Sequence, residues 1–437
     1  MASPETGPKR RPSLWRRHRV AIGFLAPAAL LLGIWIIYPT IYTIVRSFLD
    51  ASGSEFVGFD NYEQIFTTDI LVTAVRNNAI WLAVVPALVT AIGLVFGVLI
   101  ERIRWSVAFR AAVFMPMAIS LFAAGVIWRV MDEQDPEVGA LNAGIGAVVD
   151  AVDPPGGLPT AQPSTKDLSG TLEKGLTLNR PLQAGDIAEL GLTGIPPDAT
   201  PGEVVDARRP DPVPGGIAGL VWRDFKAGGG EPGVVEAEEP GLPNVSVQLR
   251  DSDGAVLASA ETDADGVFTF DKVEAGEHTV AIAPETFEEA FSGVNWLGSK
   301  LIVPAIMIAY IWVWAGFAMV VIAAGLAALP RDVLEAARTD GASERQVFRR
   351  VTVPLLRPVL IVVFVTMLIN VLKVFDIVLS LAPASVQDDA NVIALAMWRT
   401  SFGGGNDFGL GSAIAVFLFL LVIPLLLLNI RNFRREA

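Results

Sequence analysis

Long apolar stretches without a charged residue occupy both ends of this chain, and short basic segments separate them. A helix needs about 20 apolar residues to cross the hydrocarbon core of a bilayer, and six runs reach or approach that length. The first run is about twice as long as the apolar part of a signal peptide, so we interpret it as a retained helix. The pattern predicts six transmembrane helices, at residues 20–46, 78–100, 109–130, 301–325, 357–380 and 410–430.

Charge divides the chain into two different parts. Residues 131–300 hold 30 acidic and 10 basic residues, whereas the remainder holds 16 acidic and 23 basic ones. Of those 23 basic residues, 18 lie before residue 20 or within residues 101–110, 331–357 and 431–435. Lys and Arg concentrate on the cytoplasmic side of membrane proteins. We therefore expect a multi-pass plasma-membrane protein with both termini in the cytoplasm and residues 131–300 outside.

The composition excludes several classes of function. The 437 residues are 52% hydrophobic and 18% charged, with a mean hydropathy of +0.50. Cysteine is absent and only His18 and His278 occur, so neither thiolate chemistry nor a histidine-built metal site is expected. No Gly-x-x-x-x-Gly-Lys-Ser/Thr run and no catalytic dyad are found. We therefore expect no enzyme activity, no cofactor and no metal, and the lack of a basic patch argues against nucleic acid.

The acidic part divides into two segments of different pattern. Residues 146–213 are rich in Pro, Gly and Asp, and we interpret them as loosely folded or as a small β element that includes residues 185–192. In residues 214–290, strand-like runs alternate with turn signals such as Asp253-Gly254, which predicts an antiparallel β-sandwich. Its predicted strands are residues 217–222, 245–250, 255–260, 267–270 and 278–282.

The second segment resembles a repeat of bacterial surface proteins. Its sequence IAGLVWRDF, then EPGLPNVSVQLRDSDGAVLASAETDADGVFTF, is similar to the B-type, transthyretin-like repeats of Gram-positive adhesins. The resemblance implies an external spacer or binding platform. Related repeats can bind calcium, but the loop after Trp222 is poor in ligands, which favours solvated acidic turns over a calcium site.

The stretch between Pro330 and Pro358 predicts two short amphipathic helices with a turn at Gly341. From spacing alone, this could equally be an ordinary helical hairpin on the membrane face. Its residues, however, resemble the EAA loop of binding-protein-dependent ABC importer permeases. The residues that carry this resemblance are Glu335, Ala336, Ala337, Asp340, Gly341 and Pro354.

Other stretches are similar to the sugar-import branch of the same family. They are FVGFDNYEQIF at residues 56–66 and the predicted third helix, with residues 371–378 and 397–416 most similar to α-glucoside permeases. The resemblance covers residues 1–145 (helices one to three) and 291–437 (helices four to six, with the coupling loop 331–358). It implies an α-helical type I permease. Together with the charge and strand patterns, this predicts six transmembrane helices with an extracytoplasmic all-β insert. The long insert is the departure from the family pattern.

The resemblance also implies partners and a mechanism. The chain would pair with a second homologous permease, form half of the path for an oligosaccharide or α-glucoside, and receive it from an external sugar-binding protein. A separate dimeric ABC ATPase would accept the loop in a groove. Glu335 would make a charged contact there and Gly341 the turn. Ala336 and Ala337 would pack, and Pro354 would end the coupling helix.

Polar residues in the fifth helix are candidates for the sugar path. Asn370, Lys373 and Asp376 recur every third residue, which keeps them near one face of a helix. Ionisable groups inside a membrane are costly and usually functional. The alternatives are an internal Lys373–Asp376 pair or side chains that reach the outer interface.

Two further pairs of residues stand out in the predicted helices. Trp312 and Trp314 lie in the middle of the fourth helix, where they could stack on sugar rings or simply pack. Asn77 and Asn78 stand at the predicted start of the second helix, where we interpret them as caps.

The rival interpretation of the whole chain is a membrane-anchored surface protein that binds a partner through its β module. An anchor needs one or two spans rather than six. It has no use for an EAA pattern on the cytoplasmic side, so the sequence favours the permease.

Overall fold

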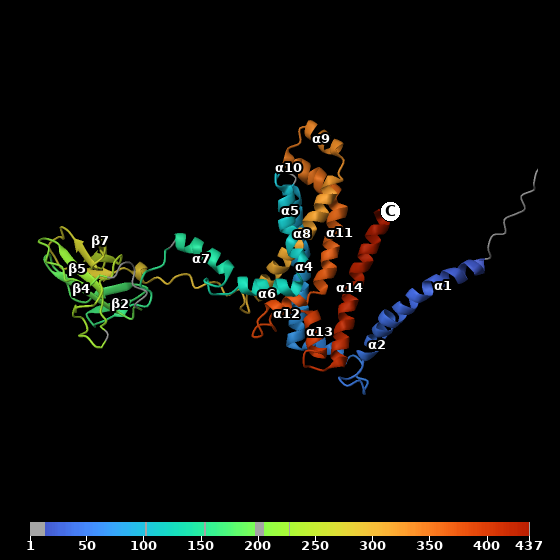
Figure 1. Cartoon of the computed structure of the whole chain (residues 1–437), viewed down its shortest axis with the longest axis horizontal. Coiled ribbons are helices and arrows are strands. Elements are labelled where there is room, and N and C mark those ends of the chain that lie inside the picture. Colours follow the sequence, from blue (N-terminus) through green and yellow to red (C-terminus); the bar gives the residue numbers. More distant parts are fainter. Residues whose placement is uncertain (1–13, 101–102, 153, 197–204, 227, 437) are drawn as a thin grey trace, which may run out of the picture. The chain divides into compact units, whose positions relative to one another are not determined.

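The computed structural model describes residues 14–100, 103–152, 154–196, 205–226 and 228–436. The chain divides into two compact units. A helical unit consists of Met1–Glu133 and Asn295–Ala437, and a β-rich unit consists of Gln134–Val294. In Figure 1 the two halves of the helical unit are coloured blue to cyan and orange to red. The β-rich unit is thus an insertion in the sequence of the helical one.

Long apolar helices dominate the helical unit. Four described helices are long and apolar enough to cross a membrane, and a bent pair adds a fifth span if its two helices cross together. The four are Ile22–Arg46, Asp69–Ile100, Ile302–Ala327 and Glu344–Leu372. The elements are α1 (Leu14–Leu32), a π-helical turn Gly33–Ile37, α2 (Tyr38–Arg46), α3 (Asp60–Thr67), α4 (Asp69–Ile100), α5 (Ser106–Phe114), α6 (Leu121–Met131), α8 (Ile302–Ala327), α9 (Arg331–Thr339), α10 (Glu344–Val347), a second π-helical turn Phe348–Thr352, α11 (Val353–Leu372), α12 (Asp376–Leu381), α13 (Ile393–Ser401) and α14 (Phe408–Glu436).

The prediction of one continuous helix over residues 109–130 is wrong. Helix α5 ends at Phe114, a 3-10 turn follows, and α6 starts at Leu121 with a bend of 104° between the two arms. Pro116 lacks a backbone N–H and so interrupts the helical hydrogen bonding. Ser120 then adopts an extended backbone and its Oγ accepts a 3.2 Å hydrogen bond from Ala123 N, which starts α6 as a separate helix.

The predicted fifth helix, residues 357–380, is also broken. Helix α11 ends at Leu372, and Lys373 and Phe375 have non-helical backbone angles before α12 begins at Asp376. An acidic residue in the first turn of α12 favours a new helix N-terminus at this point. Hydropathy continues across the break because its residues are mostly apolar, and for that reason the sequence pattern did not show it.

Close packing of α4 against α8 forms the centre of the helical unit; both helices stand in its middle in Figure 1. Gly93 of α4 lies so close to α8 that a Cβ there would be 2.5 Å from the Ala318 Cβ. Small residues allow such backbone approach between membrane helices. Trp81 and Tyr310 pack edge to face across the same pair, with ring centroids 5.3 Å apart.

The β-rich unit contains two sheets. Their strand orders are β1-β4-β5-β8 and β2-β3-β9-β6-β7, and every named pair is antiparallel except the parallel pair β4–β5. One buried apolar cluster includes Leu190 and Ile217 of the first sheet and Val247 and Ile282 of the second. The strands are β1 (Gln162–Pro163), β2 (Leu168–Thr171), β3 (Gly175–Leu178), β4 (Ile187–Thr193), β5 (Ile217–Arg223), β6 (Ser246–Arg250), β7 (Val256–Glu261), β8 (Val267–Phe270) and β9 (Thr279–Ile282).

The structure changes the predicted division of this unit. The strands predicted within 214–290 are confirmed as β5 to β9. Residues 146–213 are not a separate segment, however, because β1 to β4 lie in the same two sheets. The parallel pairing of β4 with β5 could not be found from local turn signals, since parallel neighbours need a long connection. Helix α7 (Ala140–Val152) precedes the strands and was not predicted, so the insert is not all-β.

Candidate coupling and translocation site

The segment between α8 and α11 forms an exposed helix–turn–helix, as its pattern predicted. Pro330 precedes α9 with an extended backbone, which separates α9 from α8. Gly341 makes the turn with φ +83°, and a Cβ at this position would meet nothing within 4 Å. The Ser343 backbone N–H then donates a 2.8 Å hydrogen bond to Gln346 Oε1 in a capping box that starts α10.

The side chains that the sequence singled out lie on the surface of this segment. Glu335, Ala336, Asp340 and Gly341 are exposed, and Ala337 is half-buried. Such an array of exposed small and acidic residues leaves room for the surface of another protein.

An ion pair spans the turn of this segment. Arg338 Nε donates to Glu344 Oε1 at 2.9 Å, and this contact raises the pKa of the Arg338 guanidinium. Both side chains are about half exposed, so solvent screens the pair and it contributes little to stability. It orients α9 and α10 more than it stabilises them. The same two residues line a cavity of about 360 Å³ against the ends of α4 and α8.

The predicted role of Pro354 differs from its observed place. Pro354 is exposed in the first turn of α11 and does not end a helix, because the helical run continues from Glu344 to Leu372. Proline is tolerated in a first helical turn. The π-helical turn Phe348–Thr352 joins α10 to α11 and ends two residues before Pro354.

The three polar candidates of the fifth helix surround the break between α11 and α12. Asn370 lies in α11, where its Nδ2 donates a 3.1 Å hydrogen bond to Thr366 O. Lys373 and Asp376 are exposed, and no ion pair joins them in the described part of the chain. Because the helix is broken, they do not form a stripe on one face, and the Lys373–Asp376 pair considered above is not formed.

Trp312 and Trp314 have different neighbours. The Trp312 ring packs at 5.8 Å against Trp128 of α6, whereas Trp314 packs against Tyr310 and Phe317 of its own helix. Both indoles are half-buried. Each therefore has a packing role, and the structure does not bring them together with the polar residues of the α11–α12 break.

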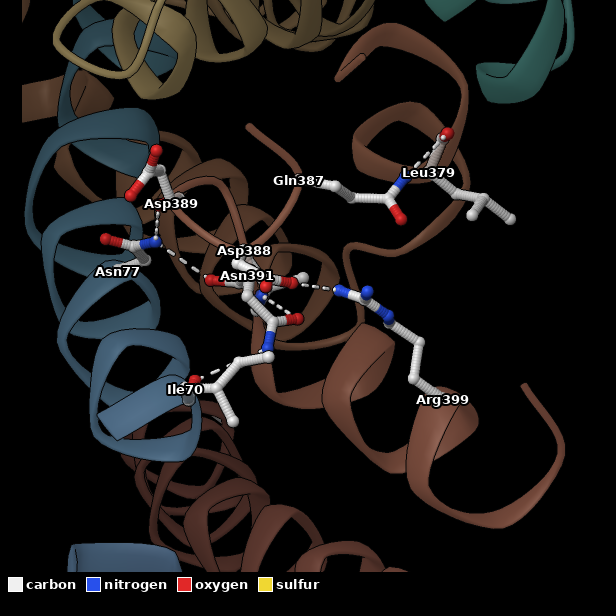
Figure 2. A network of polar contacts seen from close by, with 9 residues as sticks. Ile70, Asn77, Leu379, Gln387, Asp388, Asp389, Asn391 and Arg399 are labelled. Atoms are coloured by element: carbon white, nitrogen blue, oxygen red, sulfur yellow. Dashed lines mark hydrogen bonds and ion pairs between the residues drawn. The ribbon is translucent and has the colours of Figure 1, made fainter. Parts of the chain in front are cut away.

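The interpretation of Asn77 and Asn78 as caps is wrong, because both lie inside α4 and are buried. Asn77 Nδ2 donates to Asp389 O at 2.7 Å and to Asn391 O at 2.9 Å, as Figure 2 shows. Asn78 Oδ1 accepts a 2.7 Å hydrogen bond from Ile393 N. Two adjacent amides in an apolar run indicate buried hydrogen bonds. The sequence does not reveal their partners, because these lie more than 300 residues away.

Further contacts hold the loop between α12 and α13. Asn391 Nδ2 donates to Ile70 O at 3.4 Å, and Arg399 Nη1 donates to Asp388 Oδ1 at 2.6 Å (Figure 2). This loop is therefore tied both to the start of α4 and to α13. The network fixes the position of α13, which lines a cavity together with α2 and α14.

That cavity, of about 770 Å³, lies among α2, α13 and α14, and sequence reasoning missed it. Arg46 lines it and is only 8% exposed. Its Nη2 donates a 2.7 Å hydrogen bond to Ala51 O, whereas its Nη1 has no partner among the described residues. Ser401 and Ser412 add hydroxyl groups to the wall. The cavity can therefore offer hydrogen bonds to a polar group.

Two family models match parts of the chain. Residues 267–433 match the family described as "Binding-protein-dependent transport system inner membrane component", and residues 215–295 match the "SdrD B-like domain". The two matches fall on the parts of the chain whose motifs resemble importer permeases and the B-type repeat.

Two curated relatives align with nearly the whole chain. "Osmoprotective compounds uptake permease protein GgtC" of Synechocystis sp. is 28% identical over 414 residues, covering 94% of this chain and 98% of the relative. "Alpha-glucoside transport system permease protein AglF" of Rhizobium meliloti is 27% identical over 414 residues, covering 95% and 82%. "Trehalose/maltose transport system permease protein MalF" of Thermococcus litoralis is 38% identical over 151 residues, covering 33% and 50%.

Solved structures share the fold. A chain of the crystal structure of a bacterial ABC transporter involved in the import of the acidic polysaccharide alginate superposes with a TM-score of 0.56 at 14% identity. The superposition covers 97% of this chain and 99% of that one. The alginate transporter in complex with an alginate pentasaccharide-bound periplasmic protein gives the same TM-score. At this identity the likeness concerns the fold alone.

Proposed function

We propose that this permease forms half of the translocation path of an α-glucoside importer, together with a second homologous permease. Relatives named for α-glucosides and for trehalose and maltose support this substrate class. A separate ABC ATPase hydrolyses ATP, and an external sugar-binding protein delivers the substrate. The periplasmic protein bound to the solved alginate transporter supports that last assignment.

The exposed helix–turn–helix α9–α10 is the observation that carries this proposal. It stands between two long apolar helices, and its turn leaves Gly341 open to a partner. In our proposal, Glu335 makes a charged contact in a groove of the ATPase, Asp340 flanks the turn, and Ala336 and Ala337 pack against the groove. Pro354 supports the start of α11, so that movement of the loop reaches the membrane helix.

The sugar path is proposed to pass the break between α11 and α12. Exposed ionisable side chains are costly in hydrocarbon and are tolerated where they face water. Broken helices also present free backbone groups, which membrane proteins place along cavities. Asn370, Lys373 and Asp376 are therefore assigned to sugar hydroxyls, whereas Trp312 and Trp314 are assigned to packing against Trp128 and within α8.

We also propose six spans with cytoplasmic termini and an extracytoplasmic insert. The bent pair α5–α6 counts as the third span, α8 as the fourth and α14 as the last. The distribution of basic residues supports this orientation.

Labelling of single cysteines tests the orientation, because the chain itself contains none. Asp253→Cys in the β-rich unit should react with a membrane-impermeant maleimide in intact spheroplasts. Asp332→Cys, at the start of α9, should react only after the membrane is disrupted. Both side chains are exposed, so accessibility depends on the side of the membrane. The cysteine-free parent is the control, and the reverse labelling pattern would refute the orientation.

A further inference from the structure

Arg46, the last residue of α2, is a buried cation without a counterion. It is the one Lys or Arg found buried among the described residues. Its guanidinium forms a single hydrogen bond there, the one from Nη2 to Ala51 O, and no described carboxylate lies within ion-pair distance. Buried charges in proteins are nearly always paired, so we expect an anion from outside the chain.

The nearest acidic side chain along the chain is engaged elsewhere. Asp50 Oδ1 accepts hydrogen bonds of 2.7 Å from the backbone N–H groups of Gly53 and Ser54. Its Oδ2 accepts one from Ser52 Oγ, also at 2.7 Å. These bonds fold a turn in which Gly53 has φ +88°, and a Cβ at Gly53 would collide with Arg46 Nη1. The turn therefore holds the guanidinium in place but does not neutralise it.

The cavity of about 770 Å³ that Arg46 lines is built for an anion with an apolar part. Among the described residues in its wall, Arg46 is the only one with a charge. Ser401 and Ser412 contribute hydroxyl groups that form no hydrogen bond with a described residue. Phe402 and Phe408 add aromatic rings, with centroids 5.8 Å apart.

An apolar groove of about 220 Å³ adjoins this cavity between α2 and α14, and Thr43 and Ala415 line both. The other residues of the groove are Pro39, Thr40, Ile44, Val416 and Phe419. The hydroxyls of Thr40 and Thr43 each donate to a backbone carbonyl one turn earlier in their own helix, at 2.7 and 2.9 Å. They therefore offer few polar contacts to the groove.

The length of the first span places Arg46 at the level of lipid headgroups. The apolar span Ile22–Arg46 has 25 residues, which is about 37 Å as a helix. A bilayer measures about 40–45 Å with its headgroups, so the last residue of such a span reaches the headgroup region. The groove is lined by earlier residues of α2 and therefore lies on the hydrocarbon side of the cavity.

We propose that α2, α13 and α14 bind one phospholipid, whose phosphate pairs with Arg46 and whose acyl chain lies along the groove. Ser401 and Ser412 bond to hydroxyl groups of the headgroup, which suits phosphatidylglycerol. The bound lipid fastens α2 to α14. The site requires only that the helical unit lies in a membrane, so it does not depend on which substrate is transported.

Native mass spectrometry tests this binding on the full chain, delipidated in detergent together with any subunits that accompany it. Phosphatidylglycerol should bind saturably, with one molecule per chain. Arg46→Met should weaken it at least about tenfold, as expected for loss of a hydrogen bond to a charged group. Ala415→Phe should also weaken it, because it blocks the groove but keeps the charge. Arg129→Met is the matched control, since Arg129 is exposed in the last turn of α6, and binding should be unchanged.

Two further ligands identify what the cavity takes. Glycerophosphoglycerol has the same headgroup without acyl chains, and it should not bind saturably, because it leaves the groove empty. Maltose should not displace the lipid. Tight binding of glycerophosphoglycerol would assign the cavity to free phosphate esters, and displacement by maltose would assign it to the sugar. Either result would overturn the proposal.

Thermal unfolding separates lipid binding from folding. Without lipid, Arg46→Met should unfold at the midpoint of the unchanged protein or above it, because the variant removes an unpaired buried charge. Added phosphatidylglycerol should raise the midpoint of the unchanged protein but not that of the variant, since a ligand stabilises only a state that binds it. Equal lipid binding or equal stabilisation of the two proteins would contradict the site at Arg46, as would the absence of saturable binding.

Discussion

Replacement of Gly341 by valine should strongly reduce sugar uptake while the protein remains inserted in the membrane. The backbone φ of +83° is the left-handed region, where a β-branched side chain is strained by about 1–3 kcal/mol. No neighbouring atom lies within 4 Å, so the strain changes the turn and not the packing of the helical unit. A cost of this size at the coupling contact corresponds to a loss of about 5–150-fold in uptake. ATP-driven uptake by reconstituted vesicles is the measurement.

Three further variants assign the effect to coupling. Gly341→Asn should retain most of the uptake, because asparagine tolerates the left-handed region. Gly404→Val is the matched control, since Gly404 has φ +106° and open surroundings in the loop between α13 and α14. It should carry similar strain and keep ATP hydrolysis coupled to uptake. Glu335→Ala should lose coupling as Gly341→Val does. Normal uptake by both Gly341→Val and Glu335→Ala would remove the docking role of this loop.

Replacement of Asn77 by leucine should destabilise the helical unit and displace α13. The change removes two hydrogen bonds and leaves the carbonyls of Asp389 and Asn391 without their donor. An unsatisfied buried group costs about 1–3 kcal/mol. For a folded unit of the size of the helical one, such a cost lowers the apparent unfolding midpoint by roughly 2–4 °C per kcal/mol. Thermal denaturation in mild detergent measures it, and uptake should fall as well.

Thr90→Val on the same helix is the control for this prediction. The Thr90 hydroxyl donates only to Pro86 O within α4, at 2.7 Å, so its loss breaks no contact between elements. A midpoint close to that of the unchanged protein is expected for it. If Asn77→Leu and Thr90→Val were equally mild, the Asn77 network would not position α13.

The parts of the fold that depend on local pattern were predictable. Charge-free runs located α4 and α8, and turn signals located β5 to β9, because hydropathy and turn residues act within a few positions. The EAA residues and their turn at Gly341 were likewise visible as a short motif.

The features that depend on breaks and distant partners were not predictable. Hydropathy does not register the bend at Pro116 and Ser120, since most residues on both sides stay apolar. At the end of α11, Lys373 and Asp376 were visible, but their spacing was compatible with one continuous helix. The hydrogen bonds of Asn77 and the cavity that Arg46 lines both involve residues of other elements that are distant in the sequence. The parallel pairing of β4 with β5 joined a segment that looked loosely folded to the sandwich.

Purification of the tagged chain in mild detergent, followed by mass spectrometry of the proteins that accompany it, tests the importer assignment most directly. We predict a second permease and an ABC ATPase in the complex, with loss of the ATPase alone from the Glu335→Ala variant. Recovery of the chain alone, or only of cell-surface proteins held through the β-rich unit, would contradict the importer and favour a surface-interaction protein.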